Sequence, residues 1–173
     1  MLIDDTLPTY DVREQHEIRV RAPREKVYAE IRKLDLRGAR LTMCLMRLRG
    51  MPVQGNFTLD DFLKMRFILL GETPNEELLL GLVGRFWTVA GGLCRLTAEE
   101  YRNFHEPGFA KAAWNFSVSD LPDHSTLLAT ETRVLCLDEV SRKRFKLYWL
   151  FVGSFSGLLR RDILKTIKRN AER

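Results

Sequence analysis

The sequence predicts an α+β domain in which antiparallel strands pack against a long C-terminal helix. Two segments, 110–118 and 126–137, alternate apolar with polar residues and flank a turn signal at 121–124, a pattern typical of a β-hairpin. From Phe145 to Ile167 the apolar residues instead recur every three or four positions, as on one side of an α-helix. A chain of 173 residues, 45% of them apolar, is long enough to enclose one core.

The first elements follow from short local signals. Residues 1–15 are polar and include Pro8, so we expect an N-terminal arm there and a single domain over residues 16–173. From His16 to Ala22 apolar and charged residues alternate, which predicts a half-buried strand. Pro23 then suits the first turn of a helix, because its missing N–H has no intrahelical partner at that position.

The middle of the chain is interpreted as short helices around a second hairpin. Apolar spacing, capping boxes and turn residues carry these predictions. The expected order is a helix over 41–48, a short helix opened by the capping box at 58–61, strands at 65–70 and 78–83, a short strand at 86–89, and a helix opened by the capping box at 97–100.

Asp138 and Glu139 mark the start of the C-terminal helix. An N-cap oxygen accepts a backbone N–H, and an acid in the first turn interacts favourably with the helix dipole. Gly153 and Gly157 lie four residues apart, so one side of the helix is bare there. We expect a kink at this point rather than a close approach of another part of the chain.

Three segments carry a resemblance to a known superfamily: HEIRVRAPREKVYAEI (16–31), AWNFSV with LLATETRV (113–134) and FSGLLRRDILKTIKRNAE (155–172). With this order of elements, the chain over residues 12–173 resembles the helix-grip fold of the START-like (SRPBCC) superfamily, which includes lipid-transfer domains and polyketide cyclases. The resemblance implies a curved sheet wrapped around the terminal helix, with a cavity between them. It implies no particular activity, because one fold hosts many.

A cavity of this kind would be lined by one side of the late hairpin and one side of the C-terminal helix. Bulky aromatic residues on these two elements, with two threonines of the second strand, are the candidates. The predicted lining is Trp114, Phe116, Thr130, Thr132, Phe145 and Trp149. The same aromatic residues would also serve as an ordinary core without a ligand.

The register of the late hairpin decides which polar side chains enter the cavity. Pairing Trp114 with Thr130 places Thr130 and Thr132 inside, whereas a slip by one residue turns Glu131 and Arg133 inward. Buried unpaired charges are costly, so an outward position as cross-strand surface charges is favoured. Glu131 and Arg133 are therefore kept only as candidate polar anchors.

No motif in the sequence marks a catalytic or metal site. It contains no nucleophile-elbow serine, no HExxH and no glycine-rich phosphate loop before a helix, and its three histidines are scattered. The cysteines Cys44, Cys94 and Cys136 lack the close spacing of zinc ligands and are expected to be buried free thiols. We therefore assign no catalytic residue, no metal and no cofactor, and the sequence gives no reason to assert an enzyme.

The positive charge of the chain is concentrated at its C-terminal end. The net charge is +5, and residues 138–173 hold ten Lys or Arg and four Asp or Glu, so this stretch carries +6 and the rest −1. A basic helix can bind an anionic membrane surface peripherally, or nucleic acid, but a solvated surface is the expected role. Its aromatic residues fall on the apolar stripe, which disfavours nucleic acid. Neither a signal peptide nor an apolar run of membrane-spanning length is visible, so we expect a cytoplasmic location.

These observations lead to one main functional hypothesis and two alternatives. The main hypothesis is the binding of a hydrophobic small molecule or lipid in the cavity between the sheet and the C-terminal helix. In the first alternative, the same cavity performs a cyclase- or dehydratase-like proton transfer with Glu131, Arg133 or a histidine. In the second, the basic C-terminal helix is an interaction module.

Overall fold

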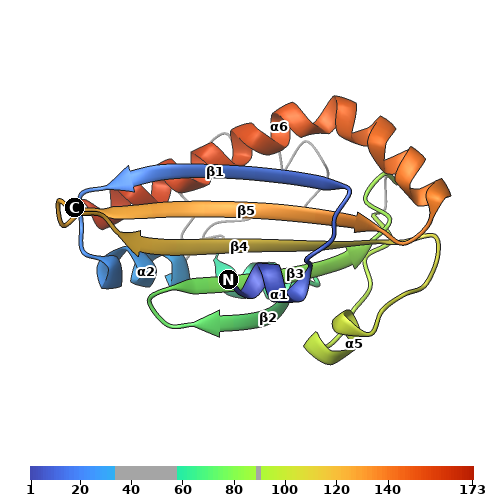
Figure 1. Ribbon diagram of the computed structural model, residues 1–173, viewed down its shortest axis with the longest axis horizontal. Coiled ribbons are helices and arrows are strands. Elements are labelled where there is room, and N and C mark those ends of the chain that lie inside the picture. The colour runs from blue at the N-terminus through green and yellow to red at the C-terminus, as the bar shows by residue number, and fades with distance from the viewer. Residues whose placement is uncertain (34–57, 89–90) are drawn as a thin grey trace.

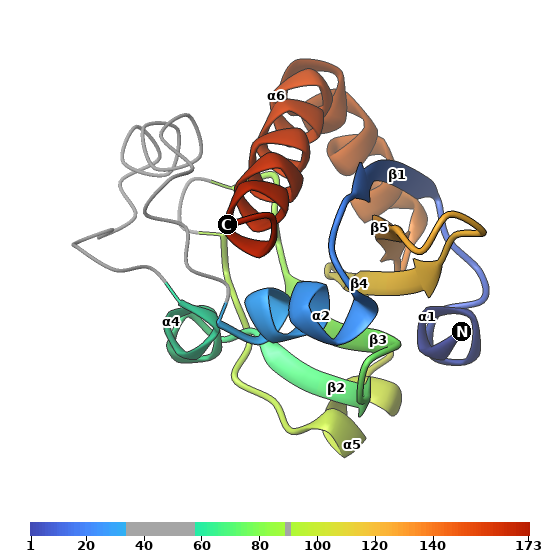
Figure 2. The same ribbon diagram turned by 90° about the vertical axis from the view of Figure 1, so that its left-hand side faces the viewer.

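The computed structural model describes residues 1–33, 58–88 and 91–173 and confirms the predicted α+β class (Figure 1). Its elements are α1 (Leu2–Thr6), β1 (Val12–Val20), α2 (Arg24–Lys33), α4 (Leu59–Lys64), β2 (Ile68–Thr73), β3 (Glu77–Gly84), α5 (Ala98–Arg102), β4 (Ala110–Asp120), β5 (Thr126–Cys136) and α6 (Glu139–Ala171). In the described part of the chain, the strands form one antiparallel sheet in the order β1-β5-β4-β3-β2. This curved sheet against a long C-terminal helix is the arrangement that the helix-grip resemblance implies (Figure 2).

The two faces of the sheet are covered by different helices. We call the face against α2 and α6 the inner face and the face against α1 and α5 the outer face. Figure 2 shows α1 and α6 on opposite sides of β4 and β5. Because both faces are covered, β3 and β4 are buried along most of their length rather than on alternate residues.

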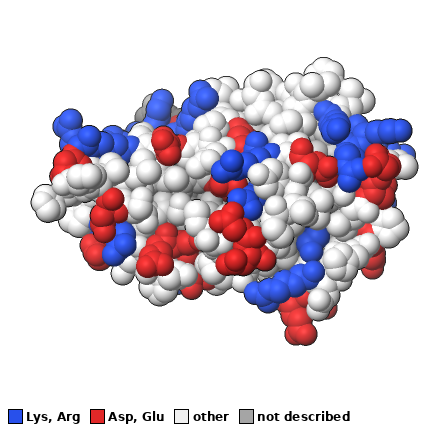
Figure 3. Space-filling view, viewed as in Figure 1, with Lys and Arg blue, Asp and Glu red and all other residues white. Residues whose placement is uncertain are grey.

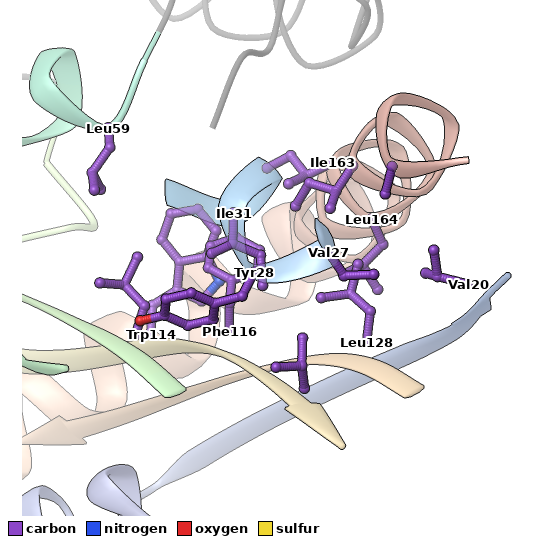
Figure 4. Close-up of a cluster of buried hydrophobic side chains, with 14 of the residues drawn as sticks. Val20, Val27, Tyr28, Ile31, Leu59, Trp114, Phe116, Leu128, Ile163 and Leu164 are labelled. Atoms are coloured by element: carbon purple, nitrogen blue, oxygen red, sulfur yellow. The ribbon is translucent and has the colours of Figure 1, made fainter. Parts of the chain in front are cut away.

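The inner face holds the largest cluster of buried apolar side chains (Figure 4). Val27, Tyr28 and Ile31 of α2 meet Ile163 and Leu164 of α6 above the sheet. Val27 and Ile31 lie four residues apart on α2, as Ile163 and Ile167 do on α6, so each helix presents one apolar side to the core. The C-terminal half of α6 therefore packs against α2 and against the strands in one core.

The predicted hairpin of β4 and β5 is confirmed, but its register differs from the prediction. Trp114 pairs with Thr132 instead of Thr130, and Phe116 pairs with Thr130. The loop 121–125, in which His124 has a φ of 61°, joins Asp120 to the Thr126 that pairs with it. A shift of two residues leaves every side chain on its expected face, because side chains alternate with a period of two.

The structure also corrects shorter predictions. Residues 86–88 lie in a turn rather than a strand, since the Thr88 N–H bonds back to the Arg85 carbonyl at 2.9 Å. The capping boxes at 58–61 and 97–100 are confirmed. The helix expected over 41–48, and Cys44 within it, lie outside the described residues.

Asp138 is the N-cap of α6, as the sequence predicts. Its carboxylate accepts hydrogen bonds from the Ser141 hydroxyl at 2.6 Å, from the Ser141 N–H at 2.9 Å and from the Gly108 N–H. These bonds, that of the Ser141 hydroxyl foremost, lower the pKa of Asp138 to about 2. None of the described helices, α6 included, combines the length and the apolar character needed to cross a membrane.

The depressed pKa of Asp138 predicts an acid-dependent loss of stability. A carboxyl group that titrates near 3.8 in the unfolded chain and near 2 in the folded one stabilises the fold above pH 4, and this contribution disappears as the pH falls toward 2. We expect Asp138→Asn to remove that component, so that the unfolding free energy of the variant falls less steeply between pH 4 and pH 2. Urea denaturation at pH 4, 3 and 2 measures both slopes, and equal slopes would contradict the assignment.

The N-terminal arm predicted for residues 1–15 is corrected by the structure. β1 begins at Val12, four residues earlier than expected, and α1 packs on the outer face with Ile3 fully buried. The Glu77 carboxylate accepts hydrogen bonds from the N–H groups of Leu2 at 2.7 Å and Ile3 at 3.3 Å. At the other end of α1, Arg133 donates to the carbonyls of Ile3 and Leu7. A carboxylate at the N-terminus and a guanidinium at the C-terminus thus bond four backbone groups at the ends of this helix, where such groups commonly lack helical partners.

Buried ion pairs join this segment to the sheet. Glu131 accepts hydrogen bonds from Arg13 at 2.7 Å and from Arg133 at 2.6 Å, and Arg133 also donates to Asp4 at 2.5 Å. The side chains of Glu131 and Arg133 are only 6% and 7% exposed. Burial would raise the pKa of Glu131, but the hydrogen bonds from the two arginines outweigh it and lower that pKa. The pair is therefore charged and structural.

We expect Arg133→Ala to lower the free energy of unfolding by about 3–5 kcal/mol, because it leaves Glu131 underpaired and removes the donor that holds α1. Chemical denaturation at pH 7 measures the loss. Arg19→Ala is the matched control: Arg19 contacts Asp123 with a side chain that is 57% exposed, so its loss should cost less than about 1 kcal/mol. Equal effects of the two substitutions would show that the buried network does not hold the N-terminal segment.

Candidate functional site

A group of polar side chains lies between the inner face of the sheet and the middle of α6. It consists of Glu14 and His16 from β1, Thr132 from β5, and Ser156 and Arg160 from α6, and we call it the Arg160 cluster. Figure 1 shows α6 running along β1 and β5, the two strands that supply the sheet side of the cluster. Charged side chains at this position interrupt a layer that is mainly apolar.

Strand and helix periods place these side chains together. In β1 the odd-numbered residues from Arg13 to Arg19 are exposed, whereas the even-numbered residues from Val12 to Val20 are buried or half-buried against α6. Glu14 and His16 belong to the even set. On α6, Ser156 and Arg160 continue the line of Ile163 and Ile167, which are buried against the sheet.

Arg160 is held by two hydroxyl groups and one aromatic ring. Its Nε and Nη2 atoms donate to Thr132 Oγ1 at 2.9 and 2.5 Å, and Nη1 donates to Ser156 Oγ at 3.1 Å. The guanidinium carbon lies 5.5 Å from the centre of the Trp114 ring, within the range of a cation–π contact. Among the described residues, no carboxylate forms an ion pair with Arg160.

Glu14 and His16 form a second contact within the cluster. Glu14 Oε1 lies 2.9 Å from His16 Nε2, and Arg161 Nε donates to His16 Nδ1 at 3.5 Å. In a neutral imidazole this geometry places the proton on Nε2, where it is donated to Glu14. The other carboxylate oxygen, Glu14 Oε2, is buried and has no hydrogen-bond partner among the described residues.

Gly157 allows this carboxylate to reach the helix. A Cβ atom at position 157 would lie 2.7 Å from Glu14 Oε1 and 3.4 Å from His16 Nε2. The first distance is shorter than a van der Waals contact, so only glycine fits while the Glu14 side chain keeps its position. The glycine expected at a kink thus lies at a close approach between α6 and β1.

The charges of the cluster follow from its position between the layers. Removal from water lowers the pKa of the Arg160 guanidinium to about 10, and the nearby Glu14 charge acts in the opposite direction. The Arg160 side chain is half-buried, remains a cation at neutral pH and is bonded to two neutral hydroxyls. Such a group can bind a carboxylate, phosphate or carbonyl oxygen of a ligand.

Three of the six predicted lining residues lie at this cluster. Trp114 Nε1 donates to Thr130 Oγ1 at 2.7 Å, and Trp114 and Thr132 both contact Arg160. Phe116 is fully buried in the inner core with the residues of α2. Alternate residues of one strand face the same layer, so the sequence predicts that Trp114 and Phe116 share a face. It does not show that Trp114 reaches Arg160 while Phe116 packs only in the core.

Phe145 and Trp149, the other two predicted lining residues, lie in a neighbouring aromatic group. Their rings stack with centroids 5.5 Å apart, and Phe145 also meets the edges of Phe86 and Trp87. Val134 of β5 packs in the same group. Because Val134 follows Thr132 by two residues on β5, this aromatic group lies on the inner face next to the Arg160 cluster.

The candidate anchors Glu131 and Arg133 are on the outer face, so they do not enter the space between the sheet and α6. The sequence favoured side chains that point away from the cavity, and both do. They are not surface charges, however, because α1 covers them. No sequence pattern indicated that residues 1–7 cover them. The enzymatic alternative loses these two groups and retains His16, whereas His105 and His124 are exposed.

The remaining candidate groups lie away from the cluster. Cys136 is buried and Cys94 is half-buried, and both are free thiols. Burial raises the pKa of both thiols, that of Cys136 to about 12, so neither is an activated nucleophile. A partly open pocket of about 410 Å³ lies on the outer face and is lined by Leu2, Asp5, Thr6, Leu70, Leu79 and Arg102.

Comparisons with known proteins assign no family. No family model matches the chain, and no curated protein matches it. Similar solved structures include a conserved protein from Geobacillus kaustophilus, with 13% identity and a TM-score of 0.46 over 92% of this chain and 95% of that chain. A protein from Thermus thermophilus gives 12% identity and a TM-score of 0.39 over 92% and 97% of the two chains. Scores of this size carry no conclusion about function.

The close approach at Gly157 can be tested by a double-mutant cycle. We expect Gly157→Ala alone to destabilise the protein by about 1–3 kcal/mol, the usual cost of an extra group in a packed site. In a Glu14→Ala background the same substitution should be neutral, or stabilising by up to about 1 kcal/mol, because alanine favours the helix and the obstructing carboxylate is gone. Chemical denaturation of the four proteins gives the coupling, and additive effects would contradict the contact.

Proposed function

We propose that the protein binds a mainly apolar small molecule or lipid between the sheet and α6, with the polar end of the ligand at the Arg160 cluster. One observation carries this proposal: Arg160 is a half-buried cation between the sheet and α6 that bonds only hydroxyls among the described residues. The helix-grip arrangement supports membership of the START-like (SRPBCC) superfamily, which we include in the proposal.

Arg160 carries a charge that no ion pair with a described residue neutralises. An ion removed from water is tolerated when a counter-ion or several hydrogen bonds replace that water. A guanidinium has five N–H donors, and the described residues accept hydrogen bonds from three of them. The remaining donors can bind an oxygen of a ligand. The ion pairs on the outer face differ in this respect. There the Glu131 carboxylate accepts hydrogen bonds from both Arg13 and Arg133, so both signs of charge are paired within the fold.

Aromatic side chains on both sides of Arg160 suit an apolar ligand body. On one side, Trp114 meets Phe62 and Phe67 edge-on with ring centroids 5.5 and 6.1 Å away. On the other side lie the stacked rings of Phe145 and Trp149. Ligand sites in proteins typically combine such apolar walls with a few convergent polar groups that fix the orientation of the ligand.

The experiment has two parts, and the first is unbiased. Denaturing extraction of the purified protein followed by mass spectrometry should release a bound amphipathic molecule. The second part is a fluorescence titration with cis-parinaric acid, an apolar chain with one carboxylate, and with its methyl ester. We expect Arg160→Gln to weaken binding of the acid about tenfold or more, since a hydrogen bond to a charged group contributes about 1.5–3 kcal/mol.

Two comparisons make this result specific. The methyl ester should bind the Arg160→Gln variant nearly as well as the unmodified protein, because it offers no carboxylate. Arg144→Gln, which changes an exposed arginine of the same helix, should leave both affinities unchanged. If no molecule is extracted and neither probe binds, the proposed function is wrong; if the acid binds equally to the Arg160→Gln variant, the assignment of the polar end is wrong.

A further inference from the structure

The side of α6 that points away from the sheet carries large apolar residues in its middle. Leu150 is 77% exposed and Phe151 is 70% exposed, which is unusual for side chains of this size. With their exposed neighbours they form what we call the outer stripe: Leu147, Leu150, Phe151, Phe155 and Leu158. At 1.5 Å per residue the stripe is about 16 Å long.

The outer stripe is distinct from the core side of the same helix. Its members recur at intervals of three and four, which places them on one side of α6. The buried residues Ser156, Ile163 and Ile167 lie on the opposite side, toward the sheet. The stripe therefore makes no contribution to the packing of α6 on the strands.

Cations lie on both sides of the outer stripe. Lys143 and Arg144 precede it on the exposed side of α6, and Arg161 and Lys165 follow it, all four with exposed side chains. From residue 140 to residue 171 the helix contains a single acidic residue, Asp162. Figure 3 shows this arrangement as an uncharged crest along α6 with Lys and Arg side chains on either side of it.

We propose that the outer stripe docks the protein on an anionic lipid bilayer. The helix lies in the plane of the interface, with the apolar side chains entering the boundary between headgroups and acyl chains and the flanking cations contacting lipid phosphates. This combination of a basic rim and an apolar centre is typical of helices that bind membrane surfaces without crossing them.

Charge selects the bilayer over other occupants of the stripe. A second copy of the chain would bring its own basic helix, which carries +6 over residues 138–173, against an identical one, and the two would repel each other. Nucleic acid would contact the cations but leave five large apolar side chains against a phosphate backbone. An anionic bilayer matches both the charge and the apolar surface.

This inference does not rest on the proposed ligand, because it concerns the opposite side of α6. The Arg160 cluster lies on the inner side of the helix whose outer side contacts the membrane, so a lipid leaving the bilayer at α6 would have a short path to the site.

The test is flotation of the full-length protein with vesicles of phosphatidylcholine alone or with about 30% phosphatidylserine, an anionic lipid that attracts basic segments. We expect binding to the anionic vesicles, loss of most of that binding in about 0.5 M NaCl because salt screens the attraction, and little binding to phosphatidylcholine. The double substitution Leu150→Gln with Phe151→Gln should lower the partition coefficient about tenfold or more, since both apolar side chains are lost from the buried surface. Leu69→Gln, which changes an exposed leucine on β2, is the matched control and should leave it unchanged.

A second readout reports insertion directly. Phe151→Trp should shift its fluorescence to the blue on binding and be quenched by brominated lipid, and this result does not depend on the folding of the double variant. Failure of the unmodified protein to bind anionic vesicles would overturn the proposal, as would a double variant that binds like the unmodified protein. A concentration-dependent dimer abolished by the double substitution would assign the outer stripe to a second copy instead.

Discussion

The packing of α6 across β1 and β5 is the constraint on which the other features of this protein depend. It divides the circumference of the helix into a side that meets the strands and a side that does not. Ile163 and Ile167 use the first side to close the core, and Arg160 lies in line with them, so an arginine is carried into the apolar layer by the helical period itself. The close approach of Glu14 to Gly157 fixes the distance between helix and strand at the same level.

Charged side chains are paired on the outer face of the sheet but not fully paired on the inner face. On the outer face, Glu131 is held between Arg13 and Arg133, so carboxylate and guanidinium satisfy each other and secure α1. On the inner face, Glu14 Oε2 has no partner among the described residues and Arg160 bonds only hydroxyls there. The outer network is complete without a further molecule, as a structural network should be. The inner cluster is the one whose polar groups are still available.

Local patterns in the sequence predicted the parts of the fold that depend on neighbours along the chain. The hairpin of β4 and β5 and the cap at Asp138 are of this kind, and both are confirmed, although the hairpin register differs by two residues. The covering of Glu131 and Arg133 by α1 was missed, because it depends on contacts more than a hundred residues apart in sequence. Glu14 lies outside the predicted strand for another reason: polar residues on the inward side of β1 weaken the alternation, so the pattern predicts a strand that begins only at His16. The even-numbered series of Ile18 and Val20, continued back to Val12, places Glu14 on the same side as His16.

Phe155 shows why helical periodicity could not define the two sides of α6. The apolar run from Leu147 to Leu159 surrounds most of the helix, and a stripe drawn through Phe155 is as regular as one drawn through Ser156. The structure buries Ser156 and leaves Phe155 exposed. A helix that is apolar around most of its circumference tends to be covered on more than one side, and the sheet covers only one. A serine on the buried side of α6 and a phenylalanine on the exposed side are therefore the reverse of the arrangement that would give the isolated chain the greatest stability. Both choices make physical sense when the inner side meets the polar end of a ligand and the outer side meets lipid.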